Sequence, residues 1–208
     1  MILLVTKLVG IIKLQIITGI YGIRSVELDL FNAANVIPEF IFTIIAIGGI
    51  NAALIPILNK AIVNETEDRL KRVFSTIVNL FFVTLLIISL LAFIFAPQII
   101  QLSQQIKLLN IENQLTAERM QLFVDLLRIL IFSPIILCVS SIFSSLLQIK
   151  NRFWITTIAP LFYNLGIIIS ALFLRSYNND IHILAYGILI GGVLHFLVQL
   201  PAIFQSDI

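Results

Sequence analysis

Long stretches without a charged residue are the feature that most limits what this chain can fold into. Residues 40–59, 73–106, 129–149, 153–174 and 181–206 contain no Asp, Glu, Lys or Arg. A helix needs about 20 consecutive apolar residues to cross the hydrocarbon core of a bilayer, so each run can supply one span. Only 12% of the residues are charged, against about 25% in a soluble domain. The chain therefore lacks the polar surface that water requires, and lipid is its predicted solvent.

The first segment, 1–21, is apolar except for Lys7 and Lys13. A cleavable signal peptide is the competing interpretation, but Lys13 would interrupt its apolar region and no convincing small-x-small cleavage site precedes Gly22. A retained helix is therefore favoured, and the chain is predicted to be all-α, a polytopic transmembrane bundle of about six helices in a single domain, 1–208. The predicted spans are 2–22, 30–58, 73–96, 119–147, 153–174 and 181–204.

Backbone breakers interrupt these spans. Pro97, followed by several polar residues, predicts that the third helix stops near Ala96. Pro38, Pro134 and Pro160 each remove a helical hydrogen bond inside a span, which lipid tolerates only where a neighbouring helix or a water-lined cavity compensates. That favours a moving or cavity-forming bundle over a rigid anchor. Glycines that allow close helix approach occur at 48–49, 187 and 191–192.

Basic residues in the short loops predict the orientation, because cytoplasmic loops are enriched in Lys and Arg. Six of them fall in the even-numbered loops and three in the odd-numbered ones. Both termini are therefore predicted to be cytoplasmic. The two sets are Lys60, Arg69, Lys71, Arg72, Lys150 and Arg152, and Arg24, Lys107 and Arg175.

Four ionisable residues near the start of the chain are the candidate substrate-binding residues: Lys7, Lys13, Asp29 and Glu39. Charges within spans are expensive, so by default they face a cavity or a partner. For Lys7 the alternative is snorkelling to the interface, and for Asp29 it is capping the second helix. Glu39 is a possible partner for Lys13 across the first two helices. Farther along, Asp125 and Arg128 have the i,i+3 spacing of a helical ion pair.

Other classes of function find no support in the sequence. It contains no zinc-protease, serine-hydrolase or nucleotide-binding motif, so the chain is not predicted to be an enzyme and no cofactor is expected. The single cysteine, Cys138, excludes a cysteine zinc site within one chain, and neither His182 nor His195 has a metal-ligand neighbour, so no metal site is expected. A net charge of +2 without a basic cluster argues against nucleic-acid binding.

Several short sequence motifs occur in this chain in the same order as in one family of bacterial transporters. The segment from Lys7 through Gly10 to Lys13 has the spacing of an R-x-x-G-x-x-R motif, and Asp29-Leu-Phe-Asn-Ala-Ala is similar to D-A-F-x-x-A. The chain thereby resembles the MurJ/MviN family, the lipid II flippases of the multidrug/oligosaccharidyl-lipid/polysaccharide exporter superfamily. The other matching strings are Ile37-Pro38-Glu39-Phe40, Gly48-Gly49, Ala53-Leu-Ile-Pro56-Ile-Leu58, Asn151-Arg152-Phe153, Ala159-Pro160, Asn164, Gly191-Gly192-Val193-Leu194 and Gln199-Leu200-Pro201.

The resemblance implies a flippase that moves lipid II, a lipid-linked peptidoglycan precursor, across the bacterial cytoplasmic membrane by alternating access. It covers only the first lobe of a two-lobed transporter, so the chain is either a fragment or half of a transporter that pairs with a second lobe. Lys7 and Lys13 stand at two arginine positions of the family and would meet the pyrophosphate of the substrate. Membrane lipids are the other expected partners.

This sequence also departs from the family. The resemblance aligns an arginine pair and a glutamate on the second helix of the family with Phe42, Thr43 and Ile47, so those roles are not carried over. Two alternatives therefore stay open. One is a non-transporting membrane scaffold or interaction protein, and the other is an exporter of another lipid-linked saccharide.

Overall fold

A computed structural model describes residues 2–22, 25–45, 56–58, 67–105, 116–174 and 180–204. These residues are almost entirely α-helical, and no strand occurs among them. The helices are α1 (Ile2–Tyr21), α2 (Val26–Ile44), α4 (Glu67–Ile94), α5 (Ala96–Gln105), α6 (Ala117–Leu130), α7 (Ser133–Ile149), α8 (Phe153–Leu174), α9 (His182–Leu197) and α10 (Leu200–Phe204).

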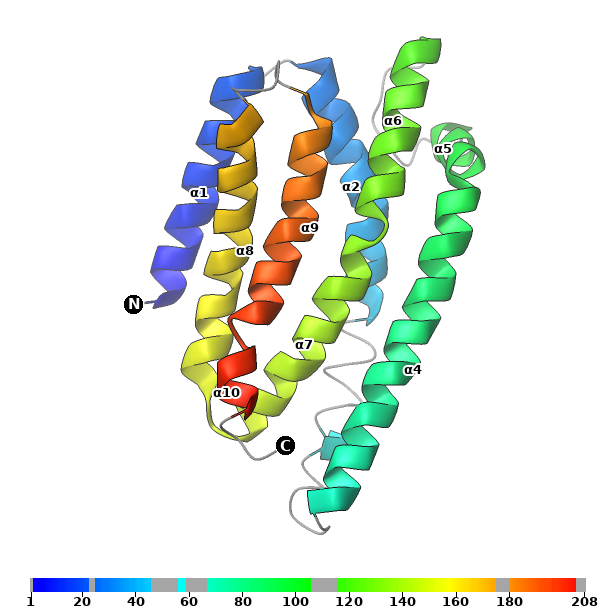
Figure 1. Cartoon of the computed structure of the whole chain (residues 1–208). Helices are drawn as coiled ribbons and strands as arrows, with labels where there is room; N and C mark the ends of the chain where they lie inside the picture. Colours follow the sequence, from blue (N-terminus) through cyan, green and yellow to red (C-terminus); the bar gives the residue numbers. More distant parts are fainter. Residues whose placement is uncertain are drawn as a thin grey trace.

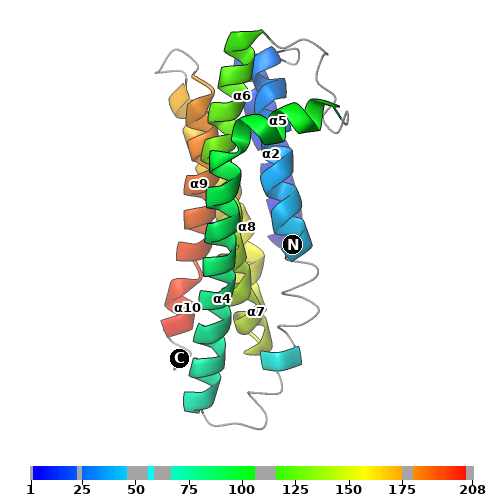
Figure 2. The same cartoon turned by 90° about the vertical axis from the view of Figure 1, so that its right-hand side faces the viewer.

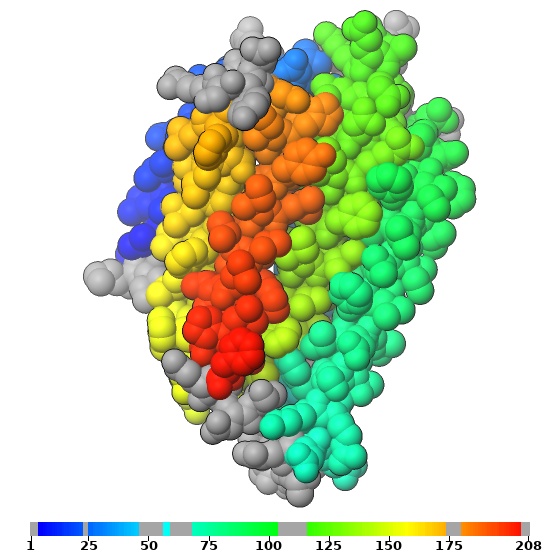
Figure 3. Space-filling model, viewed as in Figure 1, coloured from blue at the N-terminus to red at the C-terminus, as the bar shows by residue number. Residues whose placement is uncertain are grey.

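The long helices lie roughly alongside one another and form a bundle, while α5 runs across one end of it (Figures 1 and 2). Helix α1 packs against α8, α8 against α9, α9 against α7, and α7 against α4. Helix α2 lies against α6 and α7. In the space-filling view α8, α9 and α7 lie side by side across one face, with α4 at its edge (Figure 3). Many large apolar side chains point out of the bundle, as lipid-facing residues do: Leu4, for example, is 66% exposed and Leu80 63%.

The predicted all-α, multi-span architecture is confirmed. Five described segments are long and apolar enough to cross a membrane: Leu4–Tyr21, Asp68–Ile94, Ala117–Ile149, Phe153–Phe173 and His182–Phe204. They correspond to the predicted first, third, fourth, fifth and sixth spans. Helix α2 is not among the five, and it carries three carboxylates, Glu27, Asp29 and Glu39.

The second helix begins four residues earlier than predicted. Its N-cap is Ser25, whose Oγ accepts a hydrogen bond of 3.4 Å from the backbone N–H of Leu28. Asp29 is therefore not the cap. It lies in the first turn with Glu27, where negative charge meets the positive end of the helix dipole. Residues 46–55 of the predicted span, with the glycines at 48–49, lie outside the described residues.

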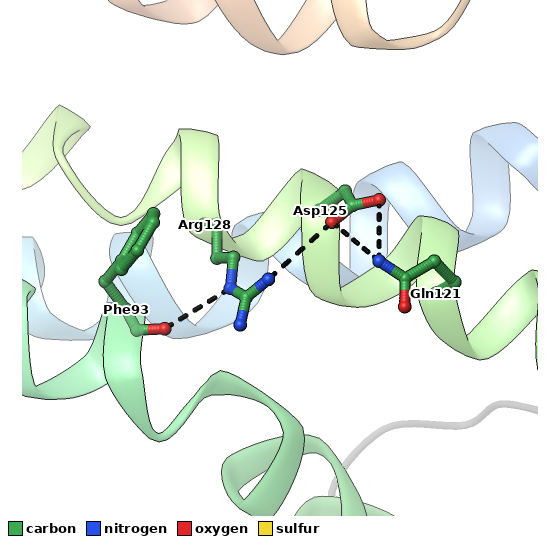
Figure 4. A network of polar contacts seen from close by, with 4 residues as sticks. All are labelled: Phe93, Gln121, Asp125 and Arg128. Atoms are coloured by element: carbon green, nitrogen blue, oxygen red, sulfur yellow. Dashed lines mark hydrogen bonds and ion pairs between the residues drawn. The ribbon is translucent and has the colours of Figure 1, made fainter.

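Pro97 ends α4 as predicted, and a neighbouring helix compensates for the break. Helix α4 stops at Ile94, and the absent N–H of Pro97 leaves the carbonyl of Phe93 without its usual donor. Arg128 of α6 takes that place: its Nε donates to the Phe93 oxygen at 3.4 Å, and its guanidinium lies 5.3 Å from the centre of the Phe93 ring. Asp125 pairs with Arg128 at 3.9 Å, as predicted, and accepts two hydrogen bonds from Gln121 (Figure 4).

Pro134 splits the predicted fourth span into α6 and α7. The chain turns at 131–132, where the N–H of Ile135 bonds to the carbonyl of Phe132 and not to that of Ile131. The hydroxyl of Ser89 on α4, only 2% exposed, donates to the Ile131 oxygen at 2.8 Å. A buried carbonyl in an apolar bundle is thus satisfied by a side chain from another helix.

Glycines allow close helix approach, as predicted for 187 and 191–192: Gly187 and Gly191 lie against α8, and Gly192 lies against Ile136 of α7. A Cβ placed on Gly191 would lie 2.5 Å from the carbonyl oxygen of Tyr163, and one on Gly166 would lie 2.6 Å from the Cα of Gly191. A Cβ on Gly187 would lie 2.6 Å from the Cβ of Ser170. The two backbones therefore approach more closely than any side chain allows.

Replacing the glycine at this crossing tests the packing. We expect Gly191→Ala to lower the midpoint of thermal unfolding in detergent, followed by circular dichroism, because the new methyl group collides with a backbone carbonyl. Gly19→Ala is the matched control, since a Cβ on Gly19 meets nothing within 4 Å and alanine favours a helix by about 1 kcal/mol. Equal midpoints for Gly191→Ala and the unsubstituted chain would show that the helices can move apart without cost.

The interhelical hydrogen bond of Ser89 gives a second prediction. Ser89→Ala leaves the Ile131 carbonyl without its donor and should lower the unfolding free energy by about 0.5–2 kcal/mol. Ser75→Ala on the same helix is the control, because within the described part of the chain the exposed Ser75 hydroxyl donates to the Arg72 carbonyl of its own helix and to no other helix. Denaturant titration of both variants in the same detergent measures the difference. A loss no larger for Ser89 than for Ser75 would contradict the compensation described above.

Candidate functional site

A cavity of about 390 Å³ lies among five helices of the bundle. Its walls combine charged, polar and apolar side chains, which is unusual at membrane depth, where ionisable groups are costly. By the liquid volume of water, the space admits on the order of ten water molecules. The lining residues are Lys13 from α1, Asn35, Pro38, Glu39 and Phe42 from α2, Ser133, Leu137 and Ser141 from α7, Pro160 and Tyr163 from α8, and His195 from α9.

Two residues of opposite charge line this cavity. Lys13 is partly buried on α1, and Glu39 lies on α2 with an exposed side chain. The predicted direct pairing is absent, however, since Lys13 and Glu39 form no ion pair within the described part of the chain. The two charges therefore line one cavity without a direct salt bridge between them.

Prolines shape the cavity wall. Pro38 and Pro160 both line it, on α2 and α8, and neither helix ends there. The side-chain amide of Asn164 donates to the Pro160 carbonyl at 3.1 Å, one turn along α8. Ser133, which precedes Pro134 at the start of α7, also lines the cavity. The structure thus contains the cavity that prolines inside spans favour.

A buried hydrogen-bond network holds the α7–α9 side of the cavity in place. Gln199, fully buried in the turn between α9 and α10, donates through Nε2 to Ser140 Oγ at 2.8 Å and to the His195 carbonyl at 2.9 Å. Ser144 Oγ donates to Gln199 Oε1 at 3.0 Å. The Ser140 hydroxyl then has its own proton available for Nδ1 of His195, 2.6 Å away. When the hydroxyl donates in this way, His195 is the neutral tautomer with its proton on Nε2.

The same network also supplies a hydrogen-bond donor where α9 ends, which is the third helix break after those at Pro97 and Pro134. The N–H of Gln199 bonds to the carbonyl of Phe196, so the His195 carbonyl lacks its usual partner four residues on. The Gln199 side chain supplies the missing donor. Pro201 follows at the start of α10, where the chain no longer continues α9.

His182 lies away from the cavity, at the start of α9. Its backbone N–H and its ring Nδ1 both contact Asp180 Oδ1, at 3.0 and 2.7 Å. Partial burial acts to raise the pKa of Asp180, but the hydrogen bonds and charge of His182 outweigh it and lower that pKa. The pair thus lies at the start of α9, in the kind of interfacial position expected for a histidine without metal-ligand neighbours. Among the described residues no group of three His, Cys, Asp or Glu could hold a metal ion.

The four residues predicted from the sequence separate into two groups. Lys13 and Glu39 line the cavity, whereas Lys7 and Asp29 lie outside its lining. Of the four side chains only that of Lys13 is partly buried, and the other three are exposed. A role in substrate binding stays a prediction for all four. The polar lining residues were not predicted from the sequence, although one signal was available: Asn35 precedes Glu39 by four residues and so shares its helix face. The other lining residues missed are Ser133, Ser141, Tyr163 and His195.

These features define a multi-pass helical membrane protein with a charged cavity inside its bundle. The model of one family, described as lipid II flippase MurJ, matches residues 23–208. The chain belongs to this family, and the resemblance inferred from its strings is confirmed. The family is one of flippases, which are transporters and not enzymes in the usual sense.

Individual relatives are similar in sequence to this chain over nearly its whole length. The probable lipid II flippase MurJ of Buchnera aphidicola subsp. Acyrthosiphon pisum is 29% identical over 206 residues, 98% of this chain and 39% of the relative. That of Thermotoga maritima is 26% identical over 94% of this chain and 38% of its own length. A solved structure, lipid II flippase MurJ in an inward closed conformation, has the same fold with a TM-score of 0.77 at 23% identity, covering 97% of this chain and 41% of that one. The chain spans about 40% of the length of these proteins.

Water access to the cavity can be measured by cysteine labelling. In a Cys138→Ala background, we expect Lys13→Cys to react with a membrane-impermeant maleimide in proteoliposomes or open membrane sheets. Leu14→Cys, the adjacent position, is the control, because Leu14 is 60% exposed on the outer, lipid-facing surface of α1. Maleimides need the thiolate, which hydrocarbon disfavours, so Leu14→Cys should react at least about tenfold more slowly. Equal rates would mean that Lys13 does not face a hydrated space.

Proposed function

We propose that this chain is the N-terminal lobe of a flippase that carries lipid II, a lipid-linked peptidoglycan precursor, across the bacterial cytoplasmic membrane by alternating access. The observation that carries the proposal is the position of Lys13, a cation inside a polar cavity of a chain that belongs to the lipid II flippase family. An anionic pyrophosphate has few other ways to be stabilised at membrane depth.

The size of the cavity supports the need for a second lobe. Pockets of about 300–1,000 Å³ hold drug-sized ligands, and this one has about 390 Å³. A headgroup built of sugars, a peptide and a pyrophosphate is larger than a drug-sized molecule. The cavity can therefore take one part of the headgroup, and the remaining volume must come from a second lobe. The relatives are long enough to contain that lobe, since this chain spans only 39% of the Buchnera protein.

The arrangement of the helix ends supports a cytoplasmic location for both termini. The first turn of α1 and the last turn of α10 are the lower ends of their helices in Figure 1. The start of α4, with Arg69, Lys71 and Arg72, and the turn between α7 and α8, with Lys150 and Arg152, lie toward the same end. Basic residues gather on the cytoplasmic side of membrane proteins.

A second candidate is the export of a different lipid-linked saccharide. Phe42 lines the cavity at a position that the resemblance aligns with an arginine of the family. Lysine at position 13 also lacks the planar fork with which arginine binds phosphate in a bidentate way. The cavity thus offers an anion fewer fixed donors than the family pattern implies, which suits a substrate with a different headgroup.

Complementation of a flippase-depleted bacterium tests the proposal. The chain is expressed alone and joined to the C-terminal remainder of a relative, and membrane levels are checked by immunoblot. We expect growth only with the joined form, loss of growth with Lys13→Gln, and retained growth with Lys13→Arg. Lys7→Gln tests separately whether the lysine outside the cavity lining is also needed. Growth with Lys13→Gln equal to that of the unsubstituted protein would remove Lys13 from the mechanism. No growth with any joined form would favour another saccharide or a scaffold.

A further inference from the structure

Glu39 is the feature of the cavity that anion transport does not explain. A carboxylate repels an anionic headgroup, and it stands in the same small space as the lysine that is meant to receive that headgroup. It lines the same cavity as Lys13 but makes no ion pair with it within the described residues. Water or a ligand can therefore enter between the two charges.

We propose that Glu39 is an internal counter-ion of Lys13, which an entering anion displaces, and that anion binding is accompanied by uptake of a proton at Glu39. The inference rests on the proposed function, because it takes Lys13 to be the contact for the anion. In the empty cavity the two charges balance each other, and in the loaded cavity the proton offsets part of the charge of the anion. The proton comes from bulk water and converts the Glu39 carboxylate to a neutral carboxylic acid.

Charge balance is the physical reason. An empty cavity with an ammonium and a carboxylate has no net charge, which membrane depth favours. An anion that joins both groups leaves at least one uncompensated negative charge, and like charges in one site raise the proton affinity of a carboxylate. Protonation of Glu39 removes the repulsion and leaves Lys13 to the ligand. Anion binding and proton binding are then thermodynamically linked, each favouring the other.

The other titratable groups of the cavity cannot accept this proton as readily. The Lys13 ammonium and the Tyr163 phenol, from α1 and α8, already carry their protons at neutral pH. His195 from α9 has its free ring nitrogen, Nδ1, occupied by the Ser140 hydroxyl at 2.6 Å. The cavity-lining residues of α7, Ser133, Leu137 and Ser141, do not titrate. Glu39 is the remaining acceptor.

Calorimetry of the full chain in detergent micelles tests the proposal, with inorganic pyrophosphate as the probe. Titrations at pH 7 and 8, each in two buffers of different ionisation enthalpy, give the affinity and the number of protons taken up. We expect Glu39→Gln to bind pyrophosphate about tenfold more tightly than the unsubstituted chain at pH 8, and to take up fewer protons. Because pyrophosphate itself titrates in this range, the difference between the two proteins isolates the contribution of Glu39.

Three further variants make the outcome decisive, after circular dichroism and gel filtration establish that each is folded. Glu39→Asp should keep the proton uptake, and His195→Gln should leave it unchanged. Lys13→Gln should lose binding. Equal affinity and proton uptake in the unsubstituted chain and Glu39→Gln would overturn the counter-ion role while leaving Lys13 as the anion contact. Binding that survives in Lys13→Gln, or no binding to the unsubstituted chain, would instead reject the anion contact and the counter-ion role with it.

Discussion

Every backbone carbonyl in the hydrocarbon region needs a hydrogen-bond donor, and the rest of this structure depends on how that need is met where helices break. Three breaks show the same solution. Arg128 donates to Phe93 at the end of α4, Ser89 donates to Ile131 between α6 and α7, and the Gln199 side chain donates to the His195 carbonyl between α9 and α10. Two of the donors come from another helix, so each break also fixes how two helices pack. The interruptions are thus part of the tertiary structure.

The cavity follows from the same principle. Straight helices packed through small residues, such as α8 and α9 at Gly191 and Gly166, leave no space between them. Space opens where Pro38 and Pro160 enter the wall and where α7 begins anew at Ser133. The network around Gln199 links Ser140, Ser144 and His195 by hydrogen bonds and so satisfies these polar groups beside the cavity.

Membership in the lipid II flippase family, matched over 23–208, and a lysine in the cavity both support the proposed anionic substrate. The cavity also differs from the family pattern. With a lysine at position 13, a phenylalanine at 42 and a carboxylate at 39, we expect a weaker affinity for anions than a set of fixed arginines would give.

The sequence by itself determined the class of protein, five of the apolar spans and their order, the end of α4 at Pro97 and the family. These depend on local composition and on motifs, which a chain carries whatever its tertiary packing. It also selected Lys13 and Glu39, because charges inside spans are costly. Only the tertiary structure decided that Lys7 and Asp29 lie outside the cavity, that Lys13 and Glu39 share it without an ion pair, and that Asn35, Tyr163 and His195 complete its lining. The physical reason is that a cavity is made by side chains from several helices, and the sequence of one helix does not fix which of its faces meets the others.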